Sequence, residues 1–195
     1  MSAEKPAIFE HNNGGEDEGA HRFELPAVIG ILPVRNAVLY PGTVTPLAIG
    51  REKSKNLLAE TIANETIIGL VTQHDPNTDR PEFKDIYTVG TAATVLKVIK
   101  MPQGSIHVVV HGLVRFKIVE PVETQPYLKA KVSLIEDQTK MTKTLQAMMV
   151  SVRQAANRVI TLSPNVPEEA AVLLENIENP SPLADFLAAN LSITI

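Results

Sequence analysis

The spacing of apolar residues changes near residue 137, and this change limits the folds that the chain can adopt. From Leu25 to Ile135, apolar and polar residues alternate with a period of two, which is the pattern of half-buried strands. Beyond this point they recur at steps of three and four, which is the pattern of an amphipathic helix. The sequence therefore predicts an α+β fold, with a β-rich domain at 25–136 followed by a small helical subdomain at 137–195.

Proline and glycine divide the first part into short segments. In Met101-Pro102-Gln103-Gly104, a proline at the first inner turn position followed by glycine favours a tight hairpin between two β-rich runs. Leu39-Tyr40-Pro41-Gly42 joins two earlier runs and predicts a turn with positive φ at Gly42. The expected strands are 27–34, 43–49, 67–71, 91–100, 105–111, 114–118 and 128–134, and the one embedded helix is 52–63 with Leu57, Leu58 and Ile62 on its inner side.

The later strands each carry one apolar face. Ile106, Val108 and Val110 share one side of their strand, and the next two strands alternate in the same way. Three successive strands with one apolar face predict an antiparallel sheet that curls around its own core, as in a small barrel. The opposite side of the last two strands brings together four cations, called the basic face below: Arg115, Lys117, Lys129 and Lys131.

In residues 137–195, apolar residues at helical spacing form one long stripe and two shorter ones. A helix is expected at 138–162, with Met141, Leu145, Met148, Met149, Val152, Ala156, Val159 and Ile160 on one face. Pro167 is expected to open a second helix with Val172, Leu173 and Ile177 inward, and Ser181-Pro182 a third with Leu183, Phe186, Leu187 and Leu191 inward. Because the chain stops in the apolar run Leu191–Ile195, we interpret the helical subdomain as truncated at its C-terminal end.

The first 24 residues differ from the rest in composition. They hold six acids against Lys5 and Arg22 and contain little to bury, so a disordered acidic tail is expected. The totals of 22 acids and 18 bases leave 16 of each in the remainder. A formally neutral body has little to attract nucleic acid or an anionic membrane, so neither is expected as a partner.

Three common motifs of catalytic sites are absent from the sequence. Nothing matches the phosphate-binding loop G-x-x-x-x-G-K-[ST], the nucleophile pattern G-x-S-x-G or the zinc pattern H-E-x-x-H. The absence of cysteine excludes disulfides and thiolate ligands, and no apolar run approaches the ~18 residues of a membrane span. We expect no catalytic residue, cofactor or metal in this segment, and a cytoplasmic location.

The candidate binding residues are therefore surface features. Tyr40, in its Pro-Gly turn, is either an exposed anchor for peptide or a plug that closes the barrel. Met101 at the hairpin tip, and Leu187 and Leu191 on the last helix, are further candidate substrate contacts. The methionines of the long helix either fill a core or form an adaptable surface. The basic face is either a solvated side of the sheet or a contact for an acidic partner, RNA or polyphosphate.

Several motifs resemble the N-terminal domain of the Lon protease family. The resemblance opens with Leu32–Gly42 (LPVRNAVLYPG) and Pro46–Ser54 (PLAIGREKS) and covers nearly everything from residue 25 onward. It continues through Gln73–Pro76, Tyr87–Ala93, Met101–Gly104, Gly112–Arg115, Pro126–Ala130 and, in the helical part, Pro180–Asp185 before Ala188-Ala189.

The resemblance implies a PUA-like pseudobarrel followed by a helical subdomain. Together they would form the substrate-recognition and assembly-supporting region of a serine protease that degrades misfolded and regulatory proteins. The resemblance also implies a parent hexamer with ATP, magnesium and a Ser-Lys peptidase dyad beyond Ile195, whereas the fragment itself should be a monomer or weak dimer. Partners would be unfolded substrates and the ATPase and protease domains of the same chain. Two alternatives remain: a free-standing protein with this domain that binds peptide or a partner protein, and a PUA-like RNA-binding module.

Overall fold

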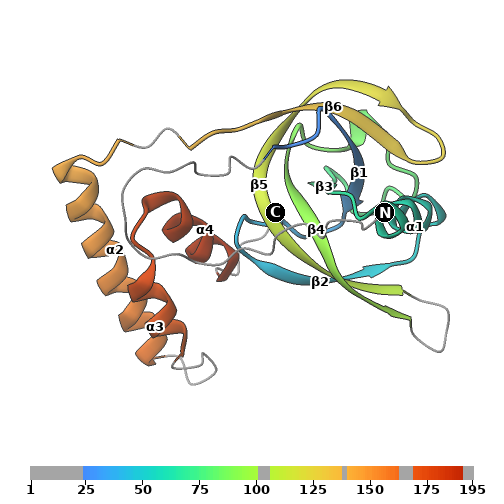
Figure 1. The fold of residues 1–195 in the computed structure, drawn as a ribbon. Coiled ribbons are helices and arrows are strands. Elements are labelled where there is room, and N and C mark those ends of the chain that lie inside the picture. Colours follow the sequence, from blue (N-terminus) through green and yellow to red (C-terminus); the bar gives the residue numbers. More distant parts are fainter. Residues whose placement is uncertain (1–23, 101–105, 138–139, 163–168, 191–195) are drawn as a thin grey trace, which may run out of the picture.

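The computed structural model describes residues 24–100, 106–137, 140–162 and 169–190. Figure 1 shows two regions, a strongly curved sheet and, beside it, a group of helices. In chain order the elements are β1 Val28–Val34, β2 Val44–Ile49, α1 Glu52–Asn64, β3 Ile68–Thr72, a 3-10 turn Phe83–Asp85, β4 Val89–Lys100, β5 Ile106–Glu123, β6 Leu128–Leu134, α2 Lys143–Leu162, α3 Glu169–Asn176 and α4 Pro180–Asn190. The mixed α+β class and the change from strands to helices are confirmed.

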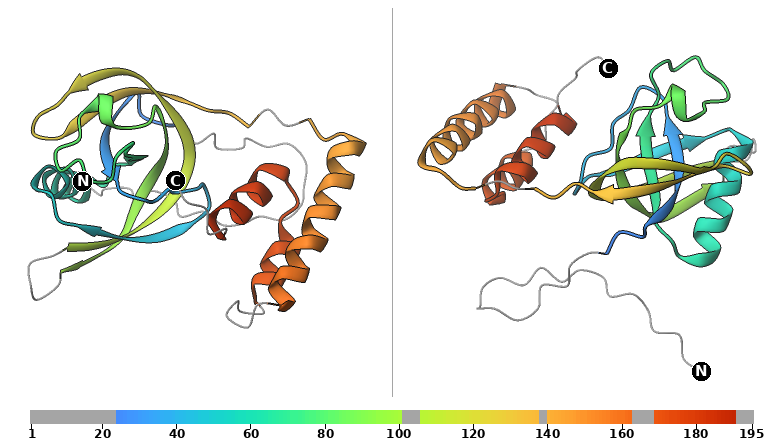
Figure 2. Two further views of the ribbon diagram at one scale, coloured as in Figure 1. Left: turned by 180° about the vertical axis from the view of Figure 1, so that it is seen from behind. Right: turned by 90° about the horizontal axis from the view of Figure 1, so that it is seen from above.

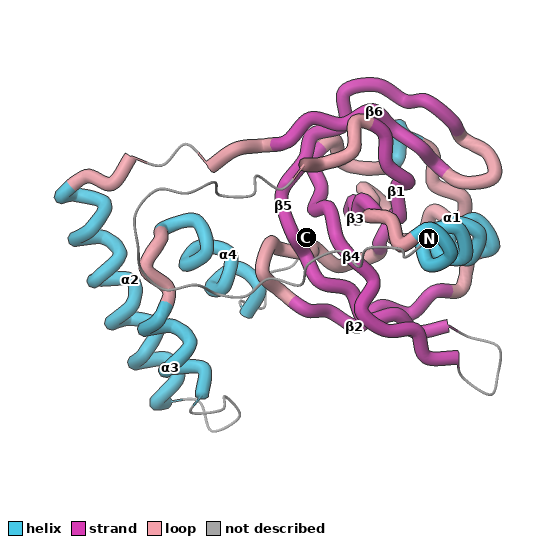
Figure 3. The backbone as a smooth tube through the Cα atoms, in the orientation of Figure 1, coloured by secondary structure: helices cyan, strands magenta, loops and turns pink. Residues whose placement is uncertain are grey.

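The six strands form one sheet that closes on itself. Their order is β2-β5-β4-β3-β1-β6, and β5 also pairs with β6, so β1, β3, β4, β5 and β6 form a ring with β2 attached to β5. We call this ring with β2 the closed sheet (Figure 3). All pairs are antiparallel except β1 with β3, which run parallel. The expected hairpin strands are confirmed, while its turn at 101–105 lies outside the described residues.

Strand β5 corrects one sequence-based expectation. The predicted strands 105–111 and 114–118 are parts of a single strand of 18 residues, and what separates them is a bulge: Ala92 pairs with Val114 and Ala93 with Gly112. Gly112 is held by the turn before β2, since Gly42 N donates to Gly112 O and Gly112 N donates to Thr43 O, both at 2.9 Å. A Cβ on Gly112 would lie 2.4 Å from the Tyr40 carbonyl oxygen, so this crossing requires glycine.

The inside of the closed sheet is filled by two adjoining apolar clusters. The first is covered by α1 through Leu57 and Leu58, and the second is centred on the fully buried Phe116. The predicted inward position of Ile62 is wrong: this side chain is exposed and Thr61 is buried in its place. The predicted positive φ at Gly42 is confirmed, at +75°.

The three later helices, α2–α4, are called the helical part and have a core of their own. Met149, Leu174 and Leu183 are buried at its centre, with Leu145, Ala156, Ile160, Ile177, Phe186 and Leu187 packed around them. Helix α2 begins at Lys143 instead of 138, because the Thr142 hydroxyl accepts a hydrogen bond from Leu145 N at 3.1 Å and caps the helix. None of the described helices is long and apolar enough to cross a membrane.

Several predicted inward positions of the helical part are wrong. On α2, Met148, Val152 and Val159 are exposed, and Met141 precedes the helix and is also exposed. On α3, Val172 and Leu173 are exposed and Leu174 is buried. The third helix begins at Pro180, two residues earlier than predicted, with Leu183 N bonded to Asn179 O at 3.2 Å. The spacing of apolar residues thus predicted the helices, but it did not show which side chains of each apolar face are buried.

Candidate functional site

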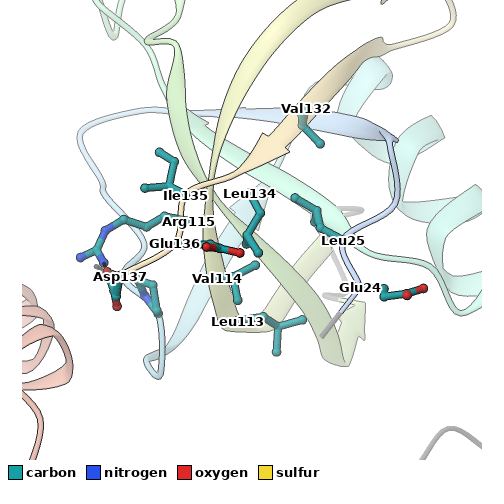
Figure 4. A pocket seen from close by; sticks show the side chains of 11 residues that line it. Glu24, Leu25, Leu113, Val114, Arg115, Val132, Leu134, Ile135, Glu136 and Asp137 are labelled. Carbon is teal, nitrogen blue, oxygen red and sulfur yellow. Dashed lines mark ion pairs between the residues drawn. The ribbon is translucent and has the colours of Figure 1, made fainter. Parts of the chain in front are cut away.

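A cleft of about 630 Å³ opens on the closed sheet where β5, β6 and the approach to β1 meet. In Figure 4, Leu134 of β6 points toward Val114 of β5, and Leu25 lies beside them. Leu134 and Ile135 are partly exposed, at 39% and 36%. The apolar lining as a whole comprises Leu25, Pro41, Leu113, Val114, Val132, Leu134 and Ile135. Such a lining can hold apolar side chains of a bound segment.

The bulge in β5 is what builds one wall of this cleft. Regular alternation would send Leu113 and Val114 to opposite sides of the sheet, but a bulge adds one residue and re-aims the side chains around it. Both residues line the cleft, together with Arg115. Ile135 is held nearby because its N–H donates to the Arg115 carbonyl at 3.0 Å. Gly112 lies next to this bulge and permits the close approach of the Tyr40 turn. It is therefore the residue in the sequence that marks this wall of the cleft.

The rim of the cleft is acidic. Glu24, Glu136 and Asp137 line it, and Arg115 is the one cation among the lining residues. Arg115 is already engaged, because its guanidinium binds Asp185 of α4 and lies 3.9 Å from Asp137. A ligand with apolar side chains flanked by lysine or arginine therefore matches this cleft better than an acidic ligand does.

The pair of Arg115 and Asp185 also connects the two regions of the molecule. The Asp185 side chain is only 5% exposed, whereas that of Arg115 is 29% exposed. Burial raises the pKa of the Asp185 carboxyl, while the charge and hydrogen bond of Arg115 act in the opposite direction. Figures 1 and 2 show α4 as the helix of the helical part that lies nearest the sheet. The ion pair therefore holds the helices next to the cleft.

Comparisons with known proteins assign the family. Residues 28–195 match the family model described as the ATP-dependent protease La (LON) substrate-binding domain. The chain belongs to the Lon substrate-binding domain family. Lon protease of Anaeromyxobacter dehalogenans (strain 2CP-C) is 42% identical over 173 residues, which are 88% of this chain and 20% of that protein. Lon protease 2 of Myxococcus xanthus is 40% identical over 173 residues, which are 88% of this chain and 21% of that protein.

Solved structures share the fold of this Lon domain. The N-terminal domain of Mycobacterium avium complex Lon protease superposes with a TM-score of 0.70 at 18% identity, covering 86% of this chain and 84% of that one. The Lon N-terminal domain protein from Xanthomonas campestris gives 0.53 at 16% identity, covering 84% and 98%. The chain spans about a fifth of the length of the curated relatives it matches.

The candidate contacts from the sequence are distributed over different places in the Lon domain. Tyr40 is half-buried, its carbonyl packs on Gly112, and the next residue, Pro41, lines the cleft. Leu187 is half-buried and packs on the core of the helical part. Met101 and Leu191 lie outside the described residues. The structure thus brings the Tyr40 turn to the cleft and packs Leu187 against the core of the helical part.

The basic face is partly neutralised. Arg115 binds Asp185, and Lys129 Nζ lies 3.6 Å from Glu60 and 3.5 Å from Glu123. Lys117 and Lys131 are exposed, and within the described ranges neither forms an ion pair. Two of the four cations are therefore occupied by carboxylates of the domain itself, which leaves less positive charge for a nucleic acid.

A second apolar surface runs along α2, whose methionines were expected from the sequence either to fill a core or to form an adaptable surface. Met148, Val152, Val159 and Leu162 are exposed, and Leu162 reaches 74%. They flank the buried stripe of Leu145, Met149, Ala156 and Ile160, so the apolar face of α2 is wider than α3 and α4 can cover. The breadth of the stripe was visible in the sequence. Which part of the stripe stays exposed depends on how α3 and α4 pack against α2, and the sequence alone does not show this.

Proposed function

We propose that this domain captures apolar segments of unfolded or damaged polypeptides for a parent Lon protease. The observation that carries the proposal is the match of residues 28–195 to the Lon substrate-binding domain. The apolar cleft beside Arg115 supports it with a surface of suitable chemistry, and its acidic rim favours segments flanked by basic residues. We place the capture site in this cleft, with the exposed stripe of α2 as a second contact.

In the same proposal the parent supplies the chemistry. It is a cytoplasmic ATP-dependent serine protease that uses ATP, magnesium and a Ser-Lys dyad outside this segment and degrades misfolded and regulatory proteins. Six copies of the domain surround one pore, so avidity compensates for modest affinity at each copy, and a single fragment is a monomer or weak dimer. The segment itself is organised as a tail at 1–24, a PUA-like pseudobarrel at 25–136 and a helical subdomain at 137–195.

The test is to measure how the 195-residue chain binds one labelled protein in two forms. A reduced, carboxymethylated form that stays unfolded should bind, and the native form should bind at least tenfold more weakly, because folding buries its apolar segments. The double variant Leu134→Ser with Ile135→Ser should weaken binding of the unfolded form about tenfold, because it removes two partly exposed apolar side chains from the cleft.

Two matched variants separate the possible surfaces. Leu96→Ser removes an exposed apolar side chain from β4, away from the cleft lining, and should leave binding unchanged. Met148→Ser with Val152→Ser tests the contribution of α2. Equal affinity for native and unfolded protein would contradict capture itself. An unaffected Leu134→Ser with Ile135→Ser variant would instead move the site away from the cleft.

A further inference from the structure

A second hollow, of about 640 Å³, lies at the N-terminal end of α1 on a different part of the closed sheet. It is bounded by Arg51, Lys53 and Ser54 at the start of α1, and by the loop around Arg80. Ile31, Pro33, Tyr127 and Leu128 supply apolar wall. This hollow shares no lining residue with the cleft, although β6 contributes to both, and it has no role in the capture mechanism proposed above.

The charges of this hollow are unequally compensated. Its three acids all form ion pairs with cations that do not line it: Glu52 with Lys55, Asp79 with Arg35 and Glu82 with Lys84. Its three cations, Arg51, Lys53 and Arg80, form no ion pair within the described ranges. The three lining cations therefore lack a directly paired carboxylate, although Asp79 is close enough to influence Arg51.

The bonds of the inner cations go to neutral oxygens. Arg51 donates to the Gln73 side-chain oxygen at 2.6 Å and to the Thr78 carbonyl at 3.0 Å, and Lys53 donates to the Thr124 carbonyl at 2.9 Å. These bonds fix the positions of both cations without cancelling their charge. Burial, and then the neighbouring Arg35, lower the pKa of Arg51, while the charge of Asp79 acts in the opposite direction.

The start of α1 adds free donors at the same place. Arg51 occupies the N-cap position and makes no side-chain cap, and the first backbone bond of the helix is from Lys55 N to Arg51 O. The N–H groups of Glu52, Lys53 and Ser54 have no acceptor among the described residues. Three free N–H groups at a helix start attract an anion, through hydrogen bonds and the helix dipole.

Ser54 is an independent sign of a ligand. Its side chain lines the hollow, the residue is only 7% exposed, and its hydroxyl has no hydrogen-bond partner in the part of the chain that the structure describes. Polar side chains that are mostly buried usually have a hydrogen-bond partner in proteins. A bound anion would accept from this hydroxyl and from the helix N–H groups together.

We propose that this hollow is a binding site for an oxyanion, a carboxylate or a phosphate, carried on a small apolar body. The oxyanion accepts from the first N–H groups of α1 and from Ser54, and Arg80 provides an ion pair. The apolar body packs against Ile31, Pro33 and Leu128. The site is separate from capture in the cleft, so either can fail without the other.

The experiment is an NMR titration of the ¹⁵N-labelled chain with three probes. N-acetyl-leucine carries a carboxylate on an apolar body, N-acetyl-leucine amide lacks the charge, and inorganic phosphate lacks the apolar body. We expect saturable shifts of the Glu52, Lys53 and Ser54 amides with N-acetyl-leucine and none with its amide. Shifts with phosphate alone would assign the site to free phosphate, whereas shifts with neither anion, or equal shifts with the amide, would overturn the proposal.

Substitutions then test the named groups. Arg80→Gln and Ser54→Ala should each weaken N-acetyl-leucine binding about three- to tenfold, because each removes a donor to the charged ligand. Arg158→Gln, at an exposed position on α2, is the matched control and should bind as the unsubstituted chain does. Undiminished binding by both Arg80→Gln and Ser54→Ala, with native-like spectra, would also overturn the proposal.

Discussion

Arg115 on β5 and Asp185 on α4 lie 70 residues apart in sequence and form the ion pair between the closed sheet and the helical part. The two partners are not equivalent, since the Asp185 side chain is buried and the Arg115 side chain keeps contact with solvent. Arg115 also has Asp137 within 3.9 Å. Removing one partner should therefore have a different effect from removing the other.

Arg115→Met should destabilise the chain more than Asp185→Asn. The first change leaves a buried carboxylate without its cation. It should lower the free energy of unfolding by about 2–4 kcal/mol, which is less than the cost of breaking a pair with both partners fully buried. The second leaves Arg115 free to reach solvent and Asp137, and should cost about 1 kcal/mol. Urea unfolding followed by circular dichroism measures both. Lys84→Met, in an exposed pair with Glu82, should change stability by less than about 0.5 kcal/mol.

The raised pKa of Asp185 predicts a pH dependence of stability. Burial raises the pKa of this carboxyl in the folded chain above its unfolded value, so the folded state binds a proton that the unfolded state has released. The contribution of Asp185 to the free energy of unfolding is therefore greatest below the unfolded pKa and falls as pH rises through the folded pKa. Asp185→Asn lacks this titration.

The comparison to make is between the unsubstituted chain and Asp185→Asn in urea at a series of pH values from 3 to 7. We expect the unsubstituted chain to lose stability relative to the variant as pH rises across the acid range. A constant difference would show that Asp185 does not titrate in this window. A difference of the opposite sign would show that Arg115 outweighs the burial of the carboxyl.

Gly112→Ala should destabilise the fold, whereas Gly50→Ala should not. An added Cβ at position 112 would lie 2.4 Å from the Tyr40 carbonyl oxygen, and a backbone atom cannot move aside as a side chain does. We expect a loss of about 1–3 kcal/mol in free energy of unfolding. At Gly50 nothing lies within 4 Å of the added atom, so its thermal or urea unfolding should match that of the unsubstituted chain. Equal effects at the two positions would contradict the assigned crossing of β5 over the Tyr40 turn.

Thr142→Ala should shorten or weaken α2. The Thr142 hydroxyl accepts from Leu145 N at 3.1 Å and satisfies one of the free N–H groups of the first turn. Its loss should cost about 1 kcal/mol and increase amide hydrogen exchange in residues 143–146. Thr161→Ala is the control, because the Thr161 hydroxyl donates to its own helix at Asn157 O and caps nothing. Unchanged exchange in Thr142→Ala would show that the cap does not set the start of the helix.

Local patterns determined much of the fold in advance. The alternation of Ile106, Val108 and Val110 identified the inner side of β5, because side chains of a strand point to opposite sides in turn. Pro41-Gly42 identified a turn with positive φ, because only glycine adopts that conformation at little cost. These features depend on neighbours in sequence, and each was confirmed.

The site depended on contacts that no local pattern contains. Arg115 was recognised as a cation on the outer side of a strand, but its partner Asp185 lies on a helix 70 residues later. Likewise the apolar stripe of α2 predicted a helix without showing which half α3 and α4 would cover. The sequence by itself determined the elements and their apolar sides, through backbone sterics and side-chain period. The tertiary structure decided which charges are paired and which apolar surface stays open, because burial and pairing depend on segments that meet only when the chain has folded.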